Sequence, residues 1–407
     1  MSQVLRALPV PDGTAALDLL PDLADALIGA GPAWLPVPAR DGRETARLVD
    51  ALGVDQPIPD GIALVMATSG STGIPKGAML PASALGASAT ATHARLGGPG
   101  SWLLALAAHH IAGMQVLVRS VLAGSEPTVL PTHGGFNPAA LVPAVAAMPG
   151  GRRYTSLVPT QLVRALEHPG ATAALAELDA VLLGGAATPA ALLARAQQSG
   201  ITVVRTYGMS ETCGGCVYDG VALDEVRIRI EDGRVLLGGA TLAAGYRNHP
   251  GHPAFAEPGW FRTDDTGVMA NGVLSVHGRM DDAITTGGLT VLPQVVEAAL
   301  AAHPGVRESA VLGMPDEQWG QRVVAVVVPG APAPTLAELR EHVSGTVGSA
   351  AAPKELHLVD HLPLRGRGKV DRRALADALR KRAQQPASRS DEITLSRLVA
   401  HIATIRA

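Results

Sequence analysis

Cysteine is nearly absent from the chain of 407 residues, which holds only Cys213 and Cys216 in the arrangement CGGC. A CxxC pair can serve redox chemistry or supply half of a metal site. No second Cys or His pair follows at metal-ligand spacing, however, and no thioredoxin-like sequence precedes the pair. We therefore expect neither a redox centre nor a zinc site, but a thiol-reduced cytoplasmic protein.

Long apolar runs and an excess of charge are absent as well. No segment approaches the roughly 18–20 uninterrupted apolar residues of a membrane span. Asp12 and Asp18 interrupt the first apolar stretch, so we also expect no signal peptide. The formal net charge is −3, which gives no reason to expect nucleic acid or an anionic membrane as a partner.

Lysine is scarce, because among 33 basic residues the only lysines are Lys76, Lys354, Lys369 and Lys381. An ammonium group is a compact point charge that the planar fork of arginine does not replace. A sequence that avoids lysine but keeps Lys76 in a Gly-rich loop and Lys369 in RGRGKVDR indicates that these two side chains take part in chemistry.

Residues 62–208 alternate short apolar runs with helical segments, a pattern that predicts parallel βα units in a layered α/β domain. Residues 1–60 show helical patterns separated by turns with proline and glycine. From about 225 to 278, short strands are separated by turn pairs such as Asp232-Gly233 and Asn271-Gly272, which predict a β-rich, hairpin-bearing subdomain.

A smaller α+β pattern follows GRMDD at 278–282. We therefore expect a large domain over 1–278 and a small, mobile C-terminal domain over 279–385, joined by a hinge at 279–282. The length is sufficient for two such domains. Residues 386–407 read as a capped amphipathic helix to which the sequence assigns no role.

The segment TSGSTGIPKG at 68–77 has the composition of a phosphate-binding loop. Glycine lets backbone N–H groups turn toward an anion, the hydroxyl groups add donors, and lysine adds charge. It is not a Walker A loop, because Pro75 stands where that motif needs glycine. The predicted nucleotide contacts in this loop are Thr68, Ser69, Gly70, Ser71, Thr72, Gly73 and Lys76.

The order of this loop and the motifs that follow it resembles the adenylate-forming superfamily, which comprises acyl-CoA synthetases, peptide-synthetase adenylation domains and luciferases. The resemblance covers roughly residues 60–385. It implies that the protein uses ATP and Mg²⁺ to activate a carboxylic acid as an acyl-adenylate and then transfers the acyl group to coenzyme A.

In this family, TYGMSET (206–212) would bind adenine and metal: the resemblance implies that Tyr207 packs by the adenine and that Glu211 ligates Mg²⁺. A carboxylate suits this ion, which takes hard oxygen ligands. WFRTDDTG (260–267) aligns Asp265 with the ribose, although Asp264 stands where glycine is usual, and Arg279 would also contact the ribose. The further nucleotide-site residues implied are Gly184, Gly185, Gly208 and Ser210.

The C-terminal motifs imply catalytic and switching roles. In RGRGKVDR (365–372), Lys369 would stabilise the charge that develops during adenylation. Asp281 would act in the hinge about which the small domain rotates between the two steps. The run AITTGG lacks the lysine that the family usually has after the hinge, but it keeps Gly287 and Gly288 for close approach to CoA.

Several stretches, among them HHIAGMQVLVRS and YGMSETCGGCVYDG, are similar to the o-succinylbenzoate–CoA ligases of menaquinone biosynthesis, a branch of this family. That acid has a second carboxylate that does not react, which would need a cation. His110 is the predicted pocket residue. The other candidates are Arg119, Arg152, Arg153 and Ser156, and the sequence does not choose among the arginines.

Three alternatives stay open. The enzyme could activate another aromatic or short acid, it could load a carrier protein instead of CoA, or the chain could be a degenerate nucleotide-binding protein. Only 67 residues precede the phosphate loop, fewer than in most of the family, so we expect a trimmed N-terminal subdomain. The sequence leaves both a monomer and a homodimer open.

Overall fold

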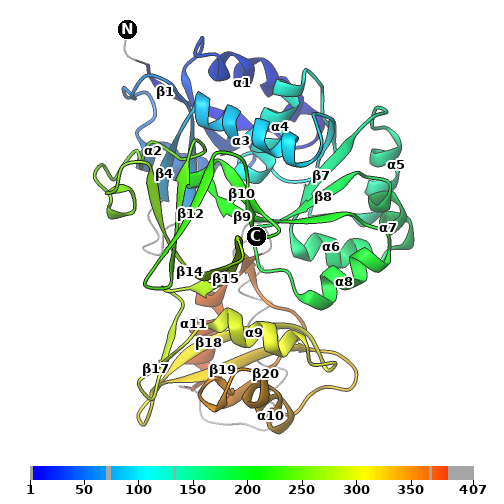
Figure 1. The fold of residues 1–407 in the computed structure, drawn as a ribbon, viewed down its shortest axis with the longest axis vertical. Helices are drawn as coiled ribbons and strands as arrows, with labels where there is room; N and C mark the ends of the chain where they lie inside the picture. The colour runs from blue at the N-terminus through cyan, green and yellow to red at the C-terminus, as the bar shows by residue number, and fades with distance from the viewer. Residues whose placement is uncertain (1–2, 70–74, 132–133, 366–368, 384–407) are drawn as a thin grey trace. The chain divides into compact units, whose positions relative to one another are not determined.

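The computed structural model describes residues 3–69, 75–131, 134–365 and 369–383 (Figure 1). The chain divides into two compact units, called here the large unit and the small unit. The large unit comprises the described residues up to Thr188 together with Leu193–Thr263 and Met269–Ser275. The small unit comprises Pro189–Leu192, Asp264–Val268 and the described residues from Val276 onward.

The first sheet of the large unit has the strand order β1-β2-β3-β4. Strands β1, β2 and β3 are parallel, and β4 returns antiparallel to β3. The elements of this region are β1 (Leu5–Val10), η1 (Gly13–Leu19), α1 (Leu20–Leu27), β2 (Ala33–Pro38), α2 (Gly42–Leu52), β3 (Ile62–Ser69) and β4 (Pro75–Pro81).

The purely helical interpretation of residues 1–60 was therefore wrong, because β1 and β2 are strands. The strand β2 was not predicted because it contains Pro36 and Pro38, and proline is unusual inside a sheet. Both residues lie on the same side of β2 as Trp34 and have no N–H for a neighbouring strand. The β2–β3 ladder is accordingly limited to Trp34 and Leu64.

The second sheet confirms the predicted parallel βα units. Its order is β11-β10-β9-β8-β7-β5-β6, in which β5 to β9 are parallel and β10 is antiparallel to β9. The strands are β5 (Ser101–Leu104), β6 (Thr128–Val129), β7 (Arg153–Leu157), β8 (Ala180–Leu183), β9 (Val203–Met209), β10 (Gly214–Tyr218) and β11 (Val221–Ala222). The helices are α3 (Ala82–Arg95), α4 (Ile111–Ala123), α5 (Leu141–Ala146), α6 (Pro159–Leu166), α7 (Pro169–Ala176) and α8 (Ala190–Gln198).

The third sheet, of order β12-β13-β14-β15, is the predicted hairpin-rich region. Its strands are β12 (Val226–Glu231), β13 (Arg234–Gly239), β14 (Trp260–Ala270) and β15 (Val273–Arg279). Both predicted turns have positive φ at their two central residues: 49° and 76° at Asp232-Gly233, and 51° and 78° at Asn271-Gly272. Positive φ at both positions is what a tight hairpin turn of this type requires.

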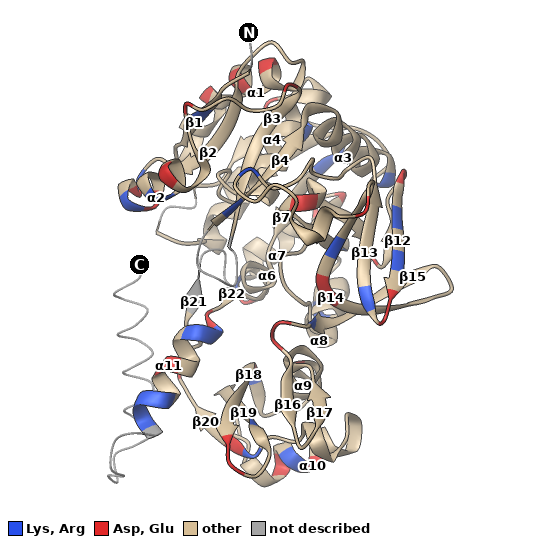
Figure 2. Ribbon diagram, turned by 90° about the vertical axis from the view of Figure 1, so that its left-hand side faces the viewer, with Lys and Arg blue, Asp and Glu red and all other residues tan. Residues whose placement is uncertain are grey.

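The small unit has the predicted α+β composition. Its main sheet has the order β17-β16-β19-β18, and β20 pairs in parallel with β19. The elements are β16 (Ile284–Thr286), β17 (Leu289–Val291), α9 (Pro293–Ala301), β18 (Val306–Asp316), β19 (Gly320–Pro329), α10 (Leu336–Thr346), β20 (Glu355–Leu358), β21 (Leu364–Arg365), β22 (Lys369–Val370) and α11 (Arg372–Ala383). Helix α11 packs against one apolar cluster of this sheet and α9 and α10 against another. The last turn of α11 holds the basic residues Arg380, Lys381 and Arg382, and basic positions are blue on the ribbon of Figure 2.

Two further predictions from the sequence concern a C-terminal helix and a membrane span. The helix predicted for 386–407 lies outside the described residues. Within the described residues, no helix combines the length and the apolar character that crossing a membrane would need.

A buried cluster of aromatic and basic side chains lies in the core of the large unit. Trp102 and Tyr154 are fully buried, and their ring centroids lie 5.1 Å apart. The Arg119 guanidinium lies 4.9 Å from the Trp102 ring centroid, and the Trp102 indole N–H donates to Nε2 of His93 over 3.3 Å. Burial, with a smaller contribution from the Arg119 charge, lowers the pKa of His93 to about 4.

The lowered pKa of His93 predicts that the free energy of unfolding decreases in acid. The unfolded chain binds a proton at His93 below its ordinary pKa of 6.5, whereas the folded chain does so only near pH 4. Stability is therefore lost as pH falls through this window, by about 2 kcal/mol at pH 5. Urea unfolding of the wild type and of His93→Gln should show the difference between the two proteins changing by about that amount between pH 7.5 and pH 5. Parallel pH profiles would contradict the prediction.

Candidate active site

The described residues of the predicted phosphate loop belong to the end of β3 and the start of β4. Thr68 and Ser69 end β3 and pair with Lys76 and Pro75 of β4. Lys76 is therefore held on a strand, which the sequence did not predict. Gly70, Ser71, Thr72 and Gly73 lie outside the described residues.

The Gly-rich motifs lie where β8 and β9 end. A Cβ atom on Gly184 would lie 2.2 Å from Oγ1 of Thr206, and one on Gly208 would lie 2.1 Å from the carbonyl oxygen of Gly214. Only glycine fits these two positions, because the neighbouring strands approach so closely. Gly185 follows β8, and Tyr207 lies on β9. In an α/β sheet, the carboxyl ends of parallel strands are the usual ligand-binding edge.

Ser210 and Glu211 follow β9 in the short helix η3 (Ser210–Thr212). Glu211 is 7% exposed, and the hydroxyl group of Tyr246 donates a hydrogen bond of 2.6 Å to its Oε1. The Lys76 ammonium lies 5.0 Å from the centroid of the Tyr246 ring. Tyr246 thus brings together the predicted metal ligand and the predicted phosphate-loop lysine.

A single carboxylate at this place is compatible with Mg²⁺. The ion usually takes one or two protein carboxylates, with substrate phosphates and water as its other ligands. The described part of the chain holds no group of three or more His, Cys, Asp or Glu residues arranged for a metal. Glu211 therefore suits an ion that arrives with a nucleotide, whereas a fully protein-bound metal would need more ligands.

The two cysteines lie in the core near this edge. Both are fully buried and free. Burial raises the pKa of the Cys216 thiol to about 12 and that of Cys213 further still. Such thiols are poor nucleophiles, which fits the expectation that CGGC has no redox role.

The candidates for the acid pocket lie at different ends of the sheet. His110 precedes α4, and its ring centroid lies 4.2 Å from that of His109. Ser156 is a buried residue near the carboxyl end of β7. Arg119, by contrast, is 3% exposed and lies against Trp102 in the core.

Arg152 and Arg153 lie at the amino end of β7, away from the ligand-binding edge. The Arg153 guanidinium donates to the carbonyl of Glu177 over 2.8 Å. The Arg152 guanidinium lies 3.0 Å from where a Cβ of Gly97 would be. We therefore do not propose that Arg152 or Arg153 binds the acid.

Arg164, which was not among the predicted site residues, is an exposed residue of α6, the helix that begins just after β7. Its guanidinium lies 5.9 Å from the ring centroid of Phe136, which lies in the segment after β6. The available signal was its place in SLVPTQLVR, seven residues beyond Leu157, where β7 ends at the ligand-binding edge of the sheet.

In the small unit, Arg279 is surrounded by acids. Its guanidinium donates two hydrogen bonds of 2.7 Å to the carboxylate of Asp281 and lies 3.6 Å from that of Asp264. The hydrogen bonds that Arg279 donates to Asp281 raise the pKa of Arg279, and the charges of Asp265 and Asp264 contribute in the same direction. The unusual Asp264 thus shares a cation with the predicted ribose ligand Asp265, which is 9% exposed.

The remaining predicted residues lie in two hairpins of the small unit. Gly287 and Gly288 form the turn between β16 and β17, with φ of 57° and 79°. Lys369 begins β22 and pairs with Arg365 of β21. The base of that hairpin is fixed because Asp371 donates its N–H to the carbonyl of Pro363 and caps α11 through its carboxylate.

Two known family models match this chain. The model of the AMP-binding enzymes matches residues 17–243, and that of the AMP-binding enzyme C-terminal domain matches residues 295–369. The chain belongs to the AMP-binding enzyme family. The first match covers more than half of the chain and includes the phosphate loop, the Gly-rich strand ends and Glu211. The second covers β18, β19 and β20 of the small unit but not β16 and β17, and it ends at Lys369.

Close relatives of this AMP-binding enzyme are 2-succinylbenzoate–CoA ligases. A probable 2-succinylbenzoate–CoA ligase of Mycobacterium tuberculosis is 57% identical over 387 residues, which is 94% of this chain and 100% of that protein. The 2-succinylbenzoate–CoA ligase of Salmonella typhimurium is 35% identical over 280 residues, covering 66% of this chain and 58% of that protein.

Solved structures share the fold of this AMP-binding enzyme. Wild-type Escherichia coli MenE bound to an analogue of OSB-AMS matches with a TM-score of 0.71 and 26% identity, covering 93% of this chain and 89% of that one. An ATP-bound RpMatB-BxBclM chimera has a TM-score of 0.81 at 23% identity, covering 94% and 90%. The large α/β region and small α+β region predicted from sequence are thereby confirmed as the fold.

Proposed function

We propose that the protein is an AMP-forming acid–thiol ligase that converts 2-succinylbenzoate to its CoA thioester, with ATP and Mg²⁺. The observation that carries the proposal is the buried Glu211 carboxylate held by Tyr246, with Lys76 against the same ring, in a chain that is 57% identical to a probable 2-succinylbenzoate–CoA ligase. We place the reaction in the cytoplasm, where ATP and CoA are available.

In the first step, a carboxylate oxygen of the acid forms a bond to the α-phosphorus of ATP. The bond from this phosphorus to the bridging oxygen breaks, and pyrophosphate leaves with the electron pair. Mg²⁺, when bound, would neutralise charge on the phosphate oxygens. Glu211 would hold that ion, Lys76 would bind the phosphates, and Lys369 would stabilise the charge that develops during the step.

The nucleoside would be held by residues that line the strand ends and by the acids near Arg279. Gly184, Gly185, Tyr207, Gly208 and Ser210 would surround the adenine, with Thr68 and Ser69 at the phosphates. Asp265 would accept hydrogen bonds from the ribose hydroxyl groups, and Arg279 would contact the ribose.

In the second step, the CoA sulfur forms a bond to the acyl carbonyl carbon. The bond from this carbon to the AMP oxygen breaks, AMP leaves with the electron pair, and the thiol proton is released. We assign the change between steps to rotation of the C-terminal domain, 279–385, about the hinge at 279–282. Asp281 would serve this rotation, and Gly287 and Gly288 would let CoA approach closely.

The second carboxylate of the acid needs a cation, and Arg164 is the exposed arginine on the helix that leaves the ligand edge. Arg164→Ala should raise the KM for 2-succinylbenzoate by roughly tenfold or more, because a hydrogen bond between charged groups is lost. The KM for ATP should stay unchanged. Arg153→Ala is the matched control. Equal effects of the two substitutions on the KM for the acid would contradict the assignment.

The experiment that tests the function measures release of AMP and pyrophosphate with 2-succinylbenzoate, with and without CoA. AMP release that requires both the acid and CoA, with a thioester product, is the expected result. Turnover with a different aromatic or short acid would retain the chemistry and reject the substrate. Transfer to a carrier protein instead of CoA would reject the acceptor. Failure with every acid would support a degenerate nucleotide-binding protein.

A further inference from the structure

The segment 243–255, AAGYRNHPGHPAF, lies outside the predicted site motifs, yet backbone hydrogen bonds join it to β4. The N–H of Ala244 donates to the carbonyl of Met79, the N–H of Met79 to that of Gly245, and the N–H of Arg247 to that of Gly77. Asn248 adds a side-chain bond to the carbonyl of Pro75. The segment therefore follows the strand that carries Lys76.

Tyr246 is the centre of this segment. It is 5% exposed, and its ring meets those of His252 and Phe255 edge-on, with centroids 4.9 and 5.2 Å away. Its hydroxyl group donates to Glu211. Because Tyr246 contacts both the His252 ring and the Glu211 carboxylate, it fixes the position of His252 relative to Glu211.

The imidazole nitrogen of His252 that lies next to Lys76 is Nε2. The N–H of Ala254 donates to Nδ1 of His252 over 3.2 Å, so in the neutral ring the hydrogen is on Nε2. Nε2 lies 3.2 Å from Nζ of Lys76. Two hydrogen-bond donors thus lie in contact, an arrangement that would be stabilised by an anion accepting hydrogen bonds from both of them on one side.

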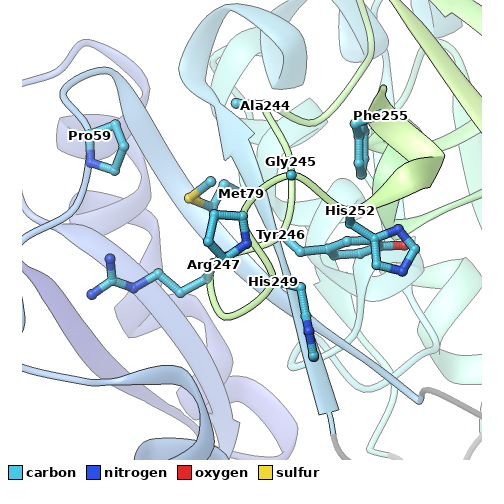
Figure 3. Close-up of a pocket in the computed structure, with 11 residues that line it drawn as sticks. Pro59, Met79, Ala244, Gly245, Tyr246, Arg247, His249, His252 and Phe255 are labelled. Carbon is cyan, nitrogen blue, oxygen red and sulfur yellow. The ribbon is translucent and has the colours of Figure 1, made fainter. Parts of the chain in front are cut away.

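The segment also borders a pocket that reaches the His252 ring but whose lining does not include Lys76. This pocket, of about 400 Å³, is lined by Met79, Gly245, Tyr246, His249, His252 and Phe255 (Figure 3). In that view, the His252 ring lies beside the Tyr246 ring, and His249 lies on the neighbouring turn. His249 is exposed, and its ring centroid is 6.3 Å from that of His252.

We infer that His252 is a phosphate-binding residue that acts with Lys76 on the β- and γ-phosphates of the nucleotide, and that Tyr246 holds this pair beside Glu211. The inference rests on the proposed function, because it assumes that a nucleoside triphosphate binds at the β3–β4 hairpin. It adds a ligand-binding residue from a segment that lies far along the chain from the phosphate loop.

The test compares binding of ATP, pyrophosphate and AMP by isothermal titration calorimetry. His252→Ala should weaken the affinity for ATP and for pyrophosphate roughly tenfold, since one hydrogen bond to a charged group is lost. AMP has no β- or γ-phosphate, so its affinity should stay unchanged. His252→Leu fills the space without a donor and should behave like His252→Ala. His252→Gln, which keeps an N–H donor, should recover much of the affinity.

His249→Ala is the matched control, because this residue lines the same pocket but does not face Lys76. Unchanged affinity of His252→Ala and His252→Leu for ATP and pyrophosphate would overturn the inference. An equal loss for AMP would overturn it too, since that points to a general disturbance of the site. If the wild type binds ATP but forms no adenylate with any acid, the proposed function fails while the binding comparison still decides the role of His252.

Discussion

Replacing Lys369 by alanine is expected to slow formation of the acyl-adenylate by a factor of about 10² to 10³, the usual cost of removing one positioned charge-stabilising donor. Negative charge grows on the α-phosphate and on pyrophosphate as the acid carboxylate attacks. A compact ammonium group that acts only at this stage lowers the barrier without being needed for binding. The affinity for ATP should therefore stay within a few-fold of the wild-type value.

The measurement separates the two half-reactions. Adenylation is followed by pyrophosphate release in a single turnover, and transfer is followed from preformed acyl-adenylate and CoA. Lys369→Ala should lose the first and keep the second. Lys381→Ala, an exposed lysine on α11, is the matched control and should keep both. Equal losses in both half-reactions would show that Lys369 supports the small unit and has no specific part in adenylation.

Glu211→Gln is the second substitution for which we expect a large effect. The amide has nearly the same shape and can still accept the hydrogen bond from Tyr246, which is 2.6 Å long in the wild type. It cannot supply the negative charge that Mg²⁺ favours in its ligands. We therefore expect adenylation to fall about a hundredfold, by loss of metal-assisted charge stabilisation.

Two readouts test this reason directly. The Mg²⁺ concentration required for half-maximal pyrophosphate release should rise in Glu211→Gln, and the Mg²⁺-dependent increase in ATP affinity should shrink. The thermal melting temperature should change little, because the Tyr246 hydrogen bond is retained. Glu126→Gln alters an exposed acid of the same unit and serves as the control. A Glu211→Gln enzyme with wild-type Mg²⁺ dependence would exclude Glu211 as the metal ligand.

Much of the fold was predictable because its signals are local. The parallel strands β5, β7 and β8 are short apolar runs followed by helices, and the Asp232-Gly233 and Asn271-Gly272 turns have the residues that positive φ favours. Strand β2 was missed because Pro36 and Pro38 suppress its signal, and β4 was missed because its first residues read as the end of a Gly-rich loop.

The sequence by itself determined which groups are available for chemistry: Lys76, Glu211, Asp265 and Lys369 stand in ordered motifs that are recognisable without coordinates. The tertiary structure alone decided which groups meet. Tyr246 reaches Glu211 across 35 positions of sequence, and His252 reaches Lys76 across 176. No local pattern encodes these contacts, because they arise when the segment 243–255 pairs with β4. Packing of the core likewise buried Arg119 beside Trp102, whereas Arg164 is exposed, a difference that periodicity along the chain does not specify.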